Sequence, residues 1–316
     1  MTAFKVAVRP GVADAPLYVP GSHEAGGALE PAVLSANENP LGPSARAIEA
    51  YRAAADHLHR YPDGGAVALR ETIGRIHRLD PARITCGAGS DEIITMLTRI
   101  FAGPGDEVLY SQHGFMMYPI SAIQAGASPV AAPETKLTAD VEALLAHITD
   151  KTKILFLANP NNPTGSCLPI AELTRLADGL PENVLLAIDA AYAEYVSRND
   201  YTAGLELVSS HDNVVMLRTF SKIHGLAGMR LGWGYMPAGI IEVLHRTRGP
   251  FNVGLVSQIA GAESIRDTAH IDAARTHNDI WLPKVRDALI AAGLDVPESV
   301  GNFLLARFPG GAEEAD

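Results

Sequence analysis

The fold of this chain is decided by the stretch Val184-Leu185-Leu186-Ala187-Ile188-Asp189, in which five consecutive apolar residues precede an acid. A continuous apolar run of this length is typical of a parallel strand, because such a strand is buried on both faces of its sheet. Similar runs predict strands at residues 83–86, 107–110, 153–157, 214–218 and 231–235. Helical patterns lie between them, at residues 69–76, 93–101, 140–147 and 170–178. This alternation predicts an α/β fold with a mostly parallel sheet and helices on both faces.

Polar side chains follow two of these strands directly. Asp189 ends one strand and Tyr192 comes three residues later, while Asn162 lies in the loop after the strand at 153–157. Ligands of such sheets bind at the carboxyl ends of the strands. An acid there can pair with a pyridine nitrogen and keep it protonated, and Asn162 and Tyr192 can reach a phenolic oxygen on the same ring. Each of these residues alone can be explained as a helix cap or a turn residue. The prediction therefore depends on their occurring together in this order along the chain.

Lys222 and Arg230 form a second polar group. Ser221 precedes the lysine, and glycines separate it from the arginine eight positions later. This arrangement suits a cofactor with an aldehyde and a phosphate, because the amine can form a Schiff base while the guanidinium and the hydroxyl bind the phosphate. On this stretch alone, an exposed lysine followed by a structural arginine explains the residues equally well.

A glycine-bearing turn at residues 86–92 precedes a predicted helix and supplies a candidate phosphate anchor. Gly89 permits close approach of the backbone, and the amides of Ser90 and Asp91 at the helix start favour an anion. Many strand-to-helix turns share this pattern. Phe115 can stack on a cofactor ring, although an aromatic residue at such a place belongs more often to the core.

Composition excludes several classes of function. The chain has 316 residues, 47% of them hydrophobic, with a net charge of −11 and a pI near 5.4, which argues against nucleic acid or an anionic membrane as a partner. Two cysteines are too few for a disulfide framework and fit a reducing compartment. The first ten residues do not have the pattern of a signal peptide, and no apolar run reaches the ~20 residues that span a bilayer. We therefore expect a cytoplasmic protein.

No metal site is expected from the eleven histidines. His57 and His59 are two residues apart and so lie on different helix faces, without a cysteine or carboxylate at ligand spacing. His224 is close to Lys222 in the sequence and is expected on the surface or behind the site.

At this point the chain resembles a known family. Its ordered segments GAGSDE (87–92), ANPNNPTG (158–165), DAAYAEY (189–195) and RTFSKIHGLAGMRLG (218–232) are similar to those of the class II aminotransferases of pyridoxal-phosphate fold type I. The segments SANENPLGP (35–43) and RYPD (60–63) resemble the histidinol-phosphate aminotransferase branch. The resemblance extends from about residue 17 to residue 308, and its motifs are specific in combination.

The resemblance implies a pyridoxal 5'-phosphate enzyme that acts as a homodimer. Lys222 would carry the cofactor and move the proton, Asp189 would bind the pyridine nitrogen, and Tyr192 would act beside them on the phenolic oxygen with Asn162. The remaining roles would be phosphate binding by Gly89, Ser90, Asp91, Ser221 and Arg230, ring stacking by Phe115, contact with the neighbouring subunit's phosphate by Tyr61, and substrate contact by Tyr18 and Asn37.

The implied reaction moves an amino group between histidinol phosphate, or a related amino donor, and 2-oxoglutarate. The alternatives are an aromatic amino acid aminotransferase, a decarboxylase of a phosphorylated amino acid, and a chain that binds the cofactor with little activity. The last alternative arises because the family's C-terminal arginine, which binds the substrate carboxylate, has no counterpart here.

Three regions are expected: residues 1–34 as an arm and part of a small domain, 35–245 as the cofactor-binding domain, and 246–316 as a small α+β domain that is incomplete at its C-terminus. We expect residues 237–247 to begin one long helix that leads into the small domain. A helix is predicted at 267–292, and the resemblance implies a strand at 302–308.

Overall fold

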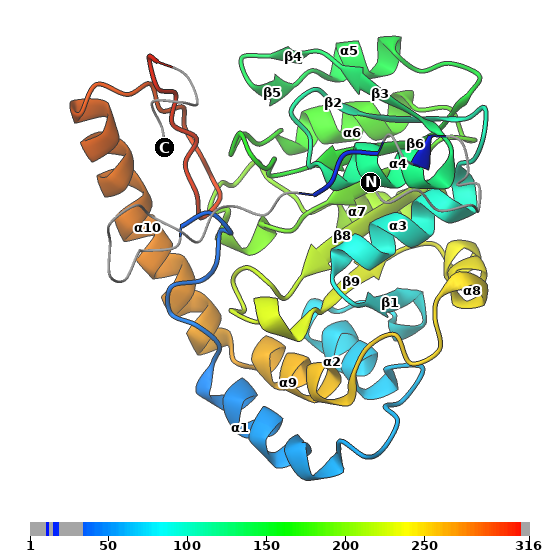
Figure 1. Ribbon diagram of the computed structural model, residues 1–316, viewed down its shortest axis with the longest axis vertical. Helices are drawn as coiled ribbons and strands as arrows, with labels where there is room; N and C mark the ends of the chain where they lie inside the picture. Colours follow the sequence, from blue (N-terminus) through cyan, green and yellow to red (C-terminus); the bar gives the residue numbers. More distant parts are fainter. Residues whose placement is uncertain (1–10, 13–14, 19–33, 311–316) are drawn as a thin grey trace, which may run out of the picture.

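The computed structural model describes residues 11–12, 15–18 and 34–310, and its centre is a seven-stranded sheet (Figure 1). The strands are β1 (Ile84–Gly87), β2 (Glu107–Ser111), β3 (Ser128–Ala132), β6 (Thr152–Ala158), β7 (Leu185–Asp189), β8 (Val214–Thr219) and β9 (Gly232–Tyr235). Their order is β1-β9-β8-β7-β6-β2-β3, and only β9 runs antiparallel to its neighbours. A separate hairpin joins β4 (Glu134–Thr135) to β5 (Thr138–Ala139).

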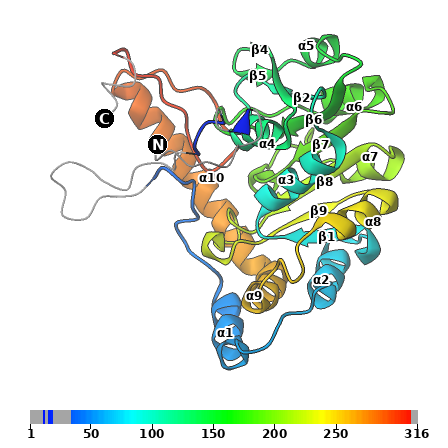
Figure 2. The same ribbon diagram turned by 45° about the vertical axis from the view of Figure 1, so that its right-hand side comes forward.

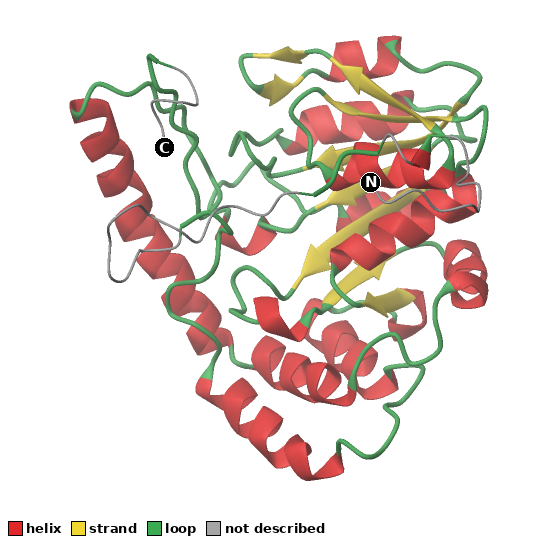
Figure 3. Cartoon of the chain, in the orientation of Figure 1, coloured by secondary structure: helices red, strands yellow, loops and turns green. Residues whose placement is uncertain are grey.

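Successive residues of the central strands enter two different hydrophobic cores, because side chains alternate across a strand. In β6, Leu155 and Leu157 belong to one core, whereas Ile154 and Phe156 belong to the other. The first core is covered by α1 (Ala45–Ala54), α2 (Val67–His77), α5 (Val141–Ala146), α6 (Ile170–Gly179), α7 (Leu205–Ser210) and α9 (Leu255–Arg266). The second core is covered by α3 (Ser90–Phe101), α4 (Met117–Ala125) and α8 (Ala238–Thr247). The expected α/β arrangement, with helices on both faces of the sheet, is therefore present (Figure 3).

One long helix, α10 (Thr268–Ala291), leads away from the sheet along the left of Figure 1. Of its 24 residues only Ala274 is buried. The segment after it, up to residue 310, lies beside its far end, while α1 and α9 lie side by side near its beginning (Figures 1 and 2). None of the described helices is both long and apolar enough to cross a membrane.

Two of the expected elements are wrong. The segment expected at 237–247 forms α8, Ala238–Thr247, which packs Ile241 and Leu244 against the sheet instead of leading into a small domain. The segment Arg248-Gly249-Pro250 follows it and ends the helix, because proline cannot continue a helix and restricts the residue before it. The predicted strand at 302–308 is a loop in which only Arg307 pairs, with Asp295. No second strand among the described residues lies there to complete a ladder.

Candidate active site

A cavity of about 810 Å³ opens at the carboxyl ends of β6, β7 and β8, beside the start of α3. This volume is in the range that small-molecule sites occupy. Most of the residues predicted from the sequence line it: Tyr18, Asn37, Ser90, Asp91, Phe115, Asn162, Asp189, Tyr192, Ser221, Lys222 and Arg230. The topology of the sheet therefore brings together residues that are up to about two hundred positions apart in the chain.

Asp189 forms the acidic end of the cavity. It is the last residue of β7, and its side chain is buried. Tyr118 Oη donates to Asp189 Oδ2 at 3.0 Å, and the Ala191 amide donates to Oδ1 at 3.3 Å. Burial raises the pKa of Asp189 to about 6, against the opposing effect of the Tyr118 hydrogen bond. The carboxylate is thus desolvated, and no cation of the described residues forms a salt bridge with it, although the charge of Lys222 lowers its pKa.

Tyr118 was not assigned a role from the sequence. It is the second residue of α4 and is fully buried, with its ring stacked on Phe156 at 4.9 Å. A tyrosine hydroxyl in a core needs a polar partner, but the sequence carries no signal that this partner is Asp189.

Tyr192 lies three residues after Asp189 and lines the same cavity. Its hydroxyl oxygen accepts from Asn37 Nδ2 at 3.1 Å and from Asn162 Nδ2 at 3.4 Å. Burial raises the pKa of Tyr192, so the phenol is neutral over the physiological range. Its hydroxyl proton remains available for an acceptor in the cavity.

The amine of Lys222 lies over the Tyr192 ring, 5.5 Å from the ring centre. It donates to the Ala36 carbonyl oxygen at 2.8 Å, so the segment near residue 36 closes one side of the cavity. Desolvation lowers the pKa of Lys222, although the carboxylates of Asp91 and Glu38 oppose the shift. A lowered pKa increases the fraction of neutral amine, which is the nucleophilic form.

The turn between β1 and α3 forms a cradle with Arg230. Arg230 Nη2 donates to Asp91 Oδ2 at 3.1 Å, and Nη1 donates to Ser221 Oγ at 3.4 Å. Gly89 has φ +85°, and a Cβ there would lie 2.7 Å from Arg230 Nη2. A Cβ on Gly232 would lie 2.3 Å from the Ser90 nitrogen. Glycine at both positions therefore lets the guanidinium and the start of α3 converge, which is the arrangement that binds a phosphate.

Tyr61 lies outside this cavity. It is 82% exposed and stacks on Phe251 with ring centres 4.7 Å apart. Its predicted contact is with a neighbouring subunit and is not made within one chain.

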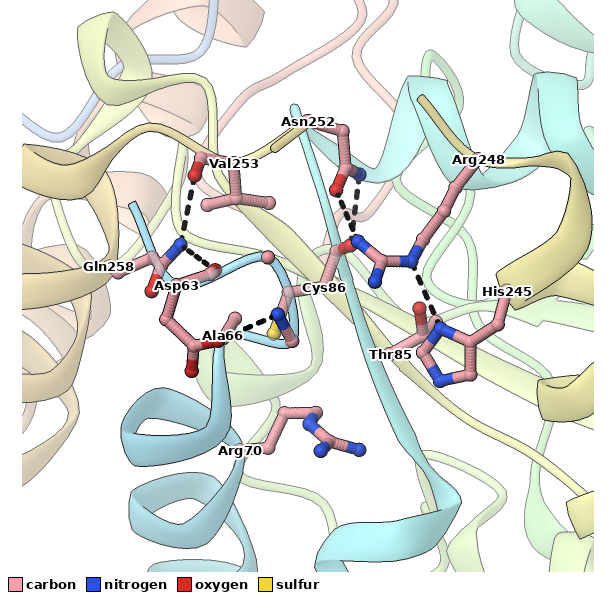
Figure 4. A pocket seen from close by; sticks show the side chains of 12 residues that line it. Asp63, Ala66, Arg70, Thr85, Cys86, His245, Arg248, Asn252, Val253 and Gln258 are labelled. Carbon is pink, nitrogen blue, oxygen red and sulfur yellow. Dashed lines mark hydrogen bonds between the residues drawn. The ribbon is translucent and has the colours of Figure 1, made fainter. Parts of the chain in front are cut away.

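A second cavity lies between α2, β1 and the loop after α8 (Figure 4). Arg248 spans it by donating to His245 Nδ1 at 3.0 Å and to Asn252 Oδ1 at 3.1 Å. Arg70 Nε has no hydrogen-bond partner within the described part of the chain. The cavity holds about 10 Å³, which is room for one water molecule and not for a substrate.

A buried ionic group lies behind Lys222. Arg218 Nη2 is 2.5 Å from Glu194 Oε1, and His224 Nε2 is 3.8 Å from the same oxygen. Burial alone would raise the pKa of Glu194, but the charges of Arg218 and His224 outweigh it and hold that pKa at about 2. His224 is buried behind the site, not on the surface. Within the described ranges, no group of three or more His, Cys, Asp or Glu side chains is placed to hold a metal.

The chain belongs to the aminotransferase class I and II family, because the family model of that description matches residues 31–315. It is a pyridoxal-phosphate-dependent transaminase with the fold type I large domain that the sequence motifs predicted.

Individual relatives narrow the similarity to one class of aminotransferase. A histidinol-phosphate aminotransferase from Paramagnetospirillum magneticum is 55% identical over 96% of this chain and 84% of its own length. One from Rhodospirillum rubrum is 55% identical over 95% of this chain and 81% of its own length. Among solved structures, the histidinol-phosphate aminotransferase from Sinorhizobium meliloti in complex with pyridoxal 5'-phosphate has a TM-score of 0.82 at 28% identity, covering 85% of this chain and 73% of that one.

The residues of the cavity fit this cofactor. Asp189 is a buried carboxylate with no salt-bridge partner in the described part of the chain, and a protonated pyridine nitrogen would supply one. The Gly89 turn has no room for a Cβ beside Arg230, so the backbone amides stay accessible to a phosphate. The Lys222 amine lies in the same cavity as both features.

Proposed function

We propose that the protein moves an amino group between histidinol phosphate and 2-oxoglutarate. The names of its relatives at 55% identity support this substrate pair over the aromatic amino acid, decarboxylase and cofactor-binding alternatives. The observation that carries the chemistry is the Lys222 amine, with its lowered pKa, in one cavity with the buried Asp189 carboxylate and the Tyr192 hydroxyl.

Bound pyridoxal phosphate supplies an electron sink that stabilises negative charge on the substrate carbon. We assign the remaining work to side chains of this chain. Lys222 Nζ would hold the aldehyde, and its free amine would move the proton at the amine-bearing carbon of the substrate. The Asp189 carboxylate would pair with the ring nitrogen and keep it protonated, which a neutral side chain at this place would not do.

The other contacts orient the cofactor. Tyr192 Oη and Asn162 Nδ2 would donate to its phenolic oxygen, and Phe115 would pack against its ring. The amides of the turn at Gly89, Ser90 and Asp91 would bind its phosphate. Ser221 Oγ and Arg230 would complete that cradle, since Arg230 already contacts both Ser221 and Asp91.

We place the substrate beside Tyr18 and Asn37. The Tyr18 ring meets Phe115 edge-on, with centres 6.5 Å apart, and Asn37 is anchored to Tyr192. The apolar neighbours Met116 and Met117 also line the cavity and suit a flat ring such as imidazole.

We also propose a cytoplasmic homodimer in which Tyr61 contacts the cofactor phosphate of the neighbouring subunit. The exposure of Tyr61 and its stacking on Phe251, outside its own cavity, support this role. Both cysteines are free thiols, which fits a reducing compartment. The proposed domains are an arm at 1–34, the cofactor domain at 35–245, and a small domain from 246 to 316, with α9 packed against the cofactor domain.

Steady-state kinetics test the proposed reaction. The purified protein with pyridoxal phosphate is given 2-oxoglutarate and either histidinol phosphate, phenylalanine or tyrosine as the donor. We expect ping-pong kinetics and the highest kcat/KM for histidinol phosphate, with Lys222→Ala as the inactive baseline. A higher kcat/KM for the aromatic amino acids would replace the proposed substrate, and turnover equal to the baseline for every donor would refute a transaminase of either kind.

A further inference from the structure

Tyr118 connects the two groups that bracket the proposed ring position. Its hydroxyl donates to Asp189 Oδ2 at 3.0 Å, and its ring meets Phe115 edge-on with centres 5.9 Å apart at 87°. Among the described residues, the other donor to the Asp189 carboxylate is the Ala191 amide, which bonds to Oδ1 at 3.3 Å. Tyr118 is therefore the side-chain donor to the oxygen that the backbone leaves free.

Three elements fix the position of this hydroxyl. The Tyr118 ring lies parallel to Phe156 of β6, with centres 4.9 Å apart and planes at 2°. Its backbone carbonyl accepts from Ser121 Oγ of α4 at 3.0 Å, and Ser121 Oγ is in turn 3.1 Å from Thr98 Oγ1 of α3. The whole side chain is inaccessible to solvent. Such a ring has one orientation, so the hydroxyl holds the carboxylate in one orientation as well.

We propose that Tyr118 is a positioning residue for transamination, which aims the Asp189 carboxylate at the cofactor's ring nitrogen and keeps that carboxylate ionised. This inference rests on the proposed function, in which Asp189 faces that nitrogen. A hydroxyl that donates to a carboxylate makes it less basic. The proton between Asp189 and the ring then stays on the nitrogen, where it strengthens the electron sink.

A purely structural role for Tyr118 predicts something different. In that case the hydroxyl only forms a hydrogen bond within the core. Its removal then changes the free energy of unfolding and leaves the protonation state of the cofactor's ring nitrogen unchanged. Both roles predict a folded Tyr118→Phe variant, because phenylalanine keeps the contacts of the ring with Phe156 and Phe115. The protonation state of the ring nitrogen distinguishes them.

The experiment compares wild type and Tyr118→Phe as holoenzymes, with isotope-labelled nitrogen in the cofactor ring observed by NMR. We expect the nitrogen signal of the variant to move toward that of unprotonated pyridine. We expect kcat with histidinol phosphate to fall roughly tenfold to a hundredfold, the range for losing one hydrogen bond to a charged group, while KM changes by less than about twofold. An unchanged nitrogen signal together with an unchanged kcat would overturn the proposal.

Two reference variants complete the test. Asp189→Asn gives the ring-nitrogen signal of a cofactor that has no carboxylate beside its nitrogen. Tyr110→Phe removes a half-buried hydroxyl from β2 that does not line the cavity, and its nitrogen signal should match wild type. A shift in Tyr110→Phe as large as that in Tyr118→Phe would overturn the specific role.

A ring-fluorinated tyrosine incorporated only at position 118 keeps the side chain and makes its hydroxyl a stronger donor. It should move the nitrogen signal away from that of unprotonated pyridine, opposite to the shift expected for Tyr118→Phe. This tests the proposal even if the phenylalanine variant fails to fold, and an unmoved signal would count against the proposal. Failure of the proposed function looks different: the wild-type signal itself would be that of unprotonated pyridine, and Asp189→Asn would leave it in place.

Discussion

Asp189 illustrates how one side chain is prepared for a ligand before the ligand binds. Burial raises the pKa of this carboxyl to about 6, and the Tyr118 hydrogen bond limits the shift. At neutral pH most of the carboxylate is therefore ionised, although no cation within residues 34–310 forms a salt bridge with it. A protonated ring nitrogen would relieve that cost, so affinity for the cofactor and catalysis depend on the same charge.

Asp189→Asn should retain pyridoxal phosphate but lose most activity. A hydrogen bond to a charged group contributes about 1.5–3 kcal/mol, so we expect cofactor affinity to fall by roughly tenfold to a hundredfold and kcat to fall much further. Affinity is measured by absorbance titration, and kcat with histidinol phosphate. Asp178→Asn, which changes an exposed acid that contacts His211, is the matched control. Normal transamination by Asp189→Asn would remove this acid from the account.

The turn from β1 into α3 shows how a short element can set the shape of the cradle. Gly89 has φ +85° and ψ 164°, a backbone conformation that costs other residues about 1–3 kcal/mol, and it also lies against Arg230. The positive φ and the close approach of Arg230 both require glycine at this position. The same backbone conformation presents the amides at the start of α3 and leaves space for the guanidinium.

Gly89→Ala should weaken cofactor binding more than it weakens the fold. The new Cβ would lie 2.7 Å from Arg230 Nη2, so the arginine must move away from Ser221 and Asp91. We expect the Kd for pyridoxal phosphate to rise about tenfold or more, the factor that corresponds to one lost charge-assisted hydrogen bond. Gly103→Ala is the control, because a Cβ there meets nothing within 4 Å. Equal Kd values for the two variants would contradict the proposed cradle.

The elements that the sequence predicted well are those whose pattern has one physical explanation. Runs such as the one that became β7 are buried on both faces, and the polar residues after them lie at strand ends, where sheet topology brings them together. The strand β3, Ser128–Ala132, was missed because it is a partly exposed edge strand that begins with Ser-Pro and lacks a long apolar run.

Other features depended on tertiary contacts that no local pattern records. The segment at 302–308 holds the apolar run Phe303-Leu304-Leu305-Ala306, but a strand also needs a neighbour, and Arg307 bridges to Asp295 alone among the described residues. Tyr118 reads as an apolar residue of α4, and its role appears only when α4 is packed against β7. The hydrogen bond from Asn37 to Tyr192 likewise joins residues 155 positions apart.

At the scale of the whole molecule, the Arg218–Glu194 pair and its neighbour His224 connect the sheet to α9 and α10. Arg218 is on β8. Glu194 lies in the short segment after β7, and its backbone carbonyl accepts a hydrogen bond from Arg275 Nε of α10 at 2.7 Å. His224, beside the pair, is 3.0 Å from Ser264 of α9 through Nδ1. A charge lost here would leave its partner buried without compensation.

Glu194→Gln should therefore lower the free energy of unfolding by about 3–5 kcal/mol, as breaking a buried ion pair does. Chemical denaturation of the apoprotein measures it. Glu242→Gln provides the control, because Glu242 pairs with Arg246 on the exposed face of α8, where such a pair contributes about 0.3–0.5 kcal/mol. If both variants unfold alike, the buried pair does not support the fold.

The same pair predicts a pH dependence. The pKa of Glu194 falls from an ordinary 4.5 to about 2 on folding, so its stabilising contribution is complete above pH 4.5 and is lost as the pH falls toward 2. The stability difference between wild type and Glu194→Gln should shrink over that acid window. A difference that stays constant through the window would show that the carboxylate is not held by Arg218.

The most direct test of the central claim is to find where the cofactor is attached. The protein is loaded with pyridoxal phosphate, reduced with borohydride and digested, and the labelled peptide is located by mass spectrometry. We predict that the label lies on Lys222 and that Lys222→Ala abolishes labelling, while Lys151→Ala, a change at an exposed lysine, leaves it intact. Label on another lysine in the wild-type protein, or full labelling of Lys222→Ala, would contradict the account.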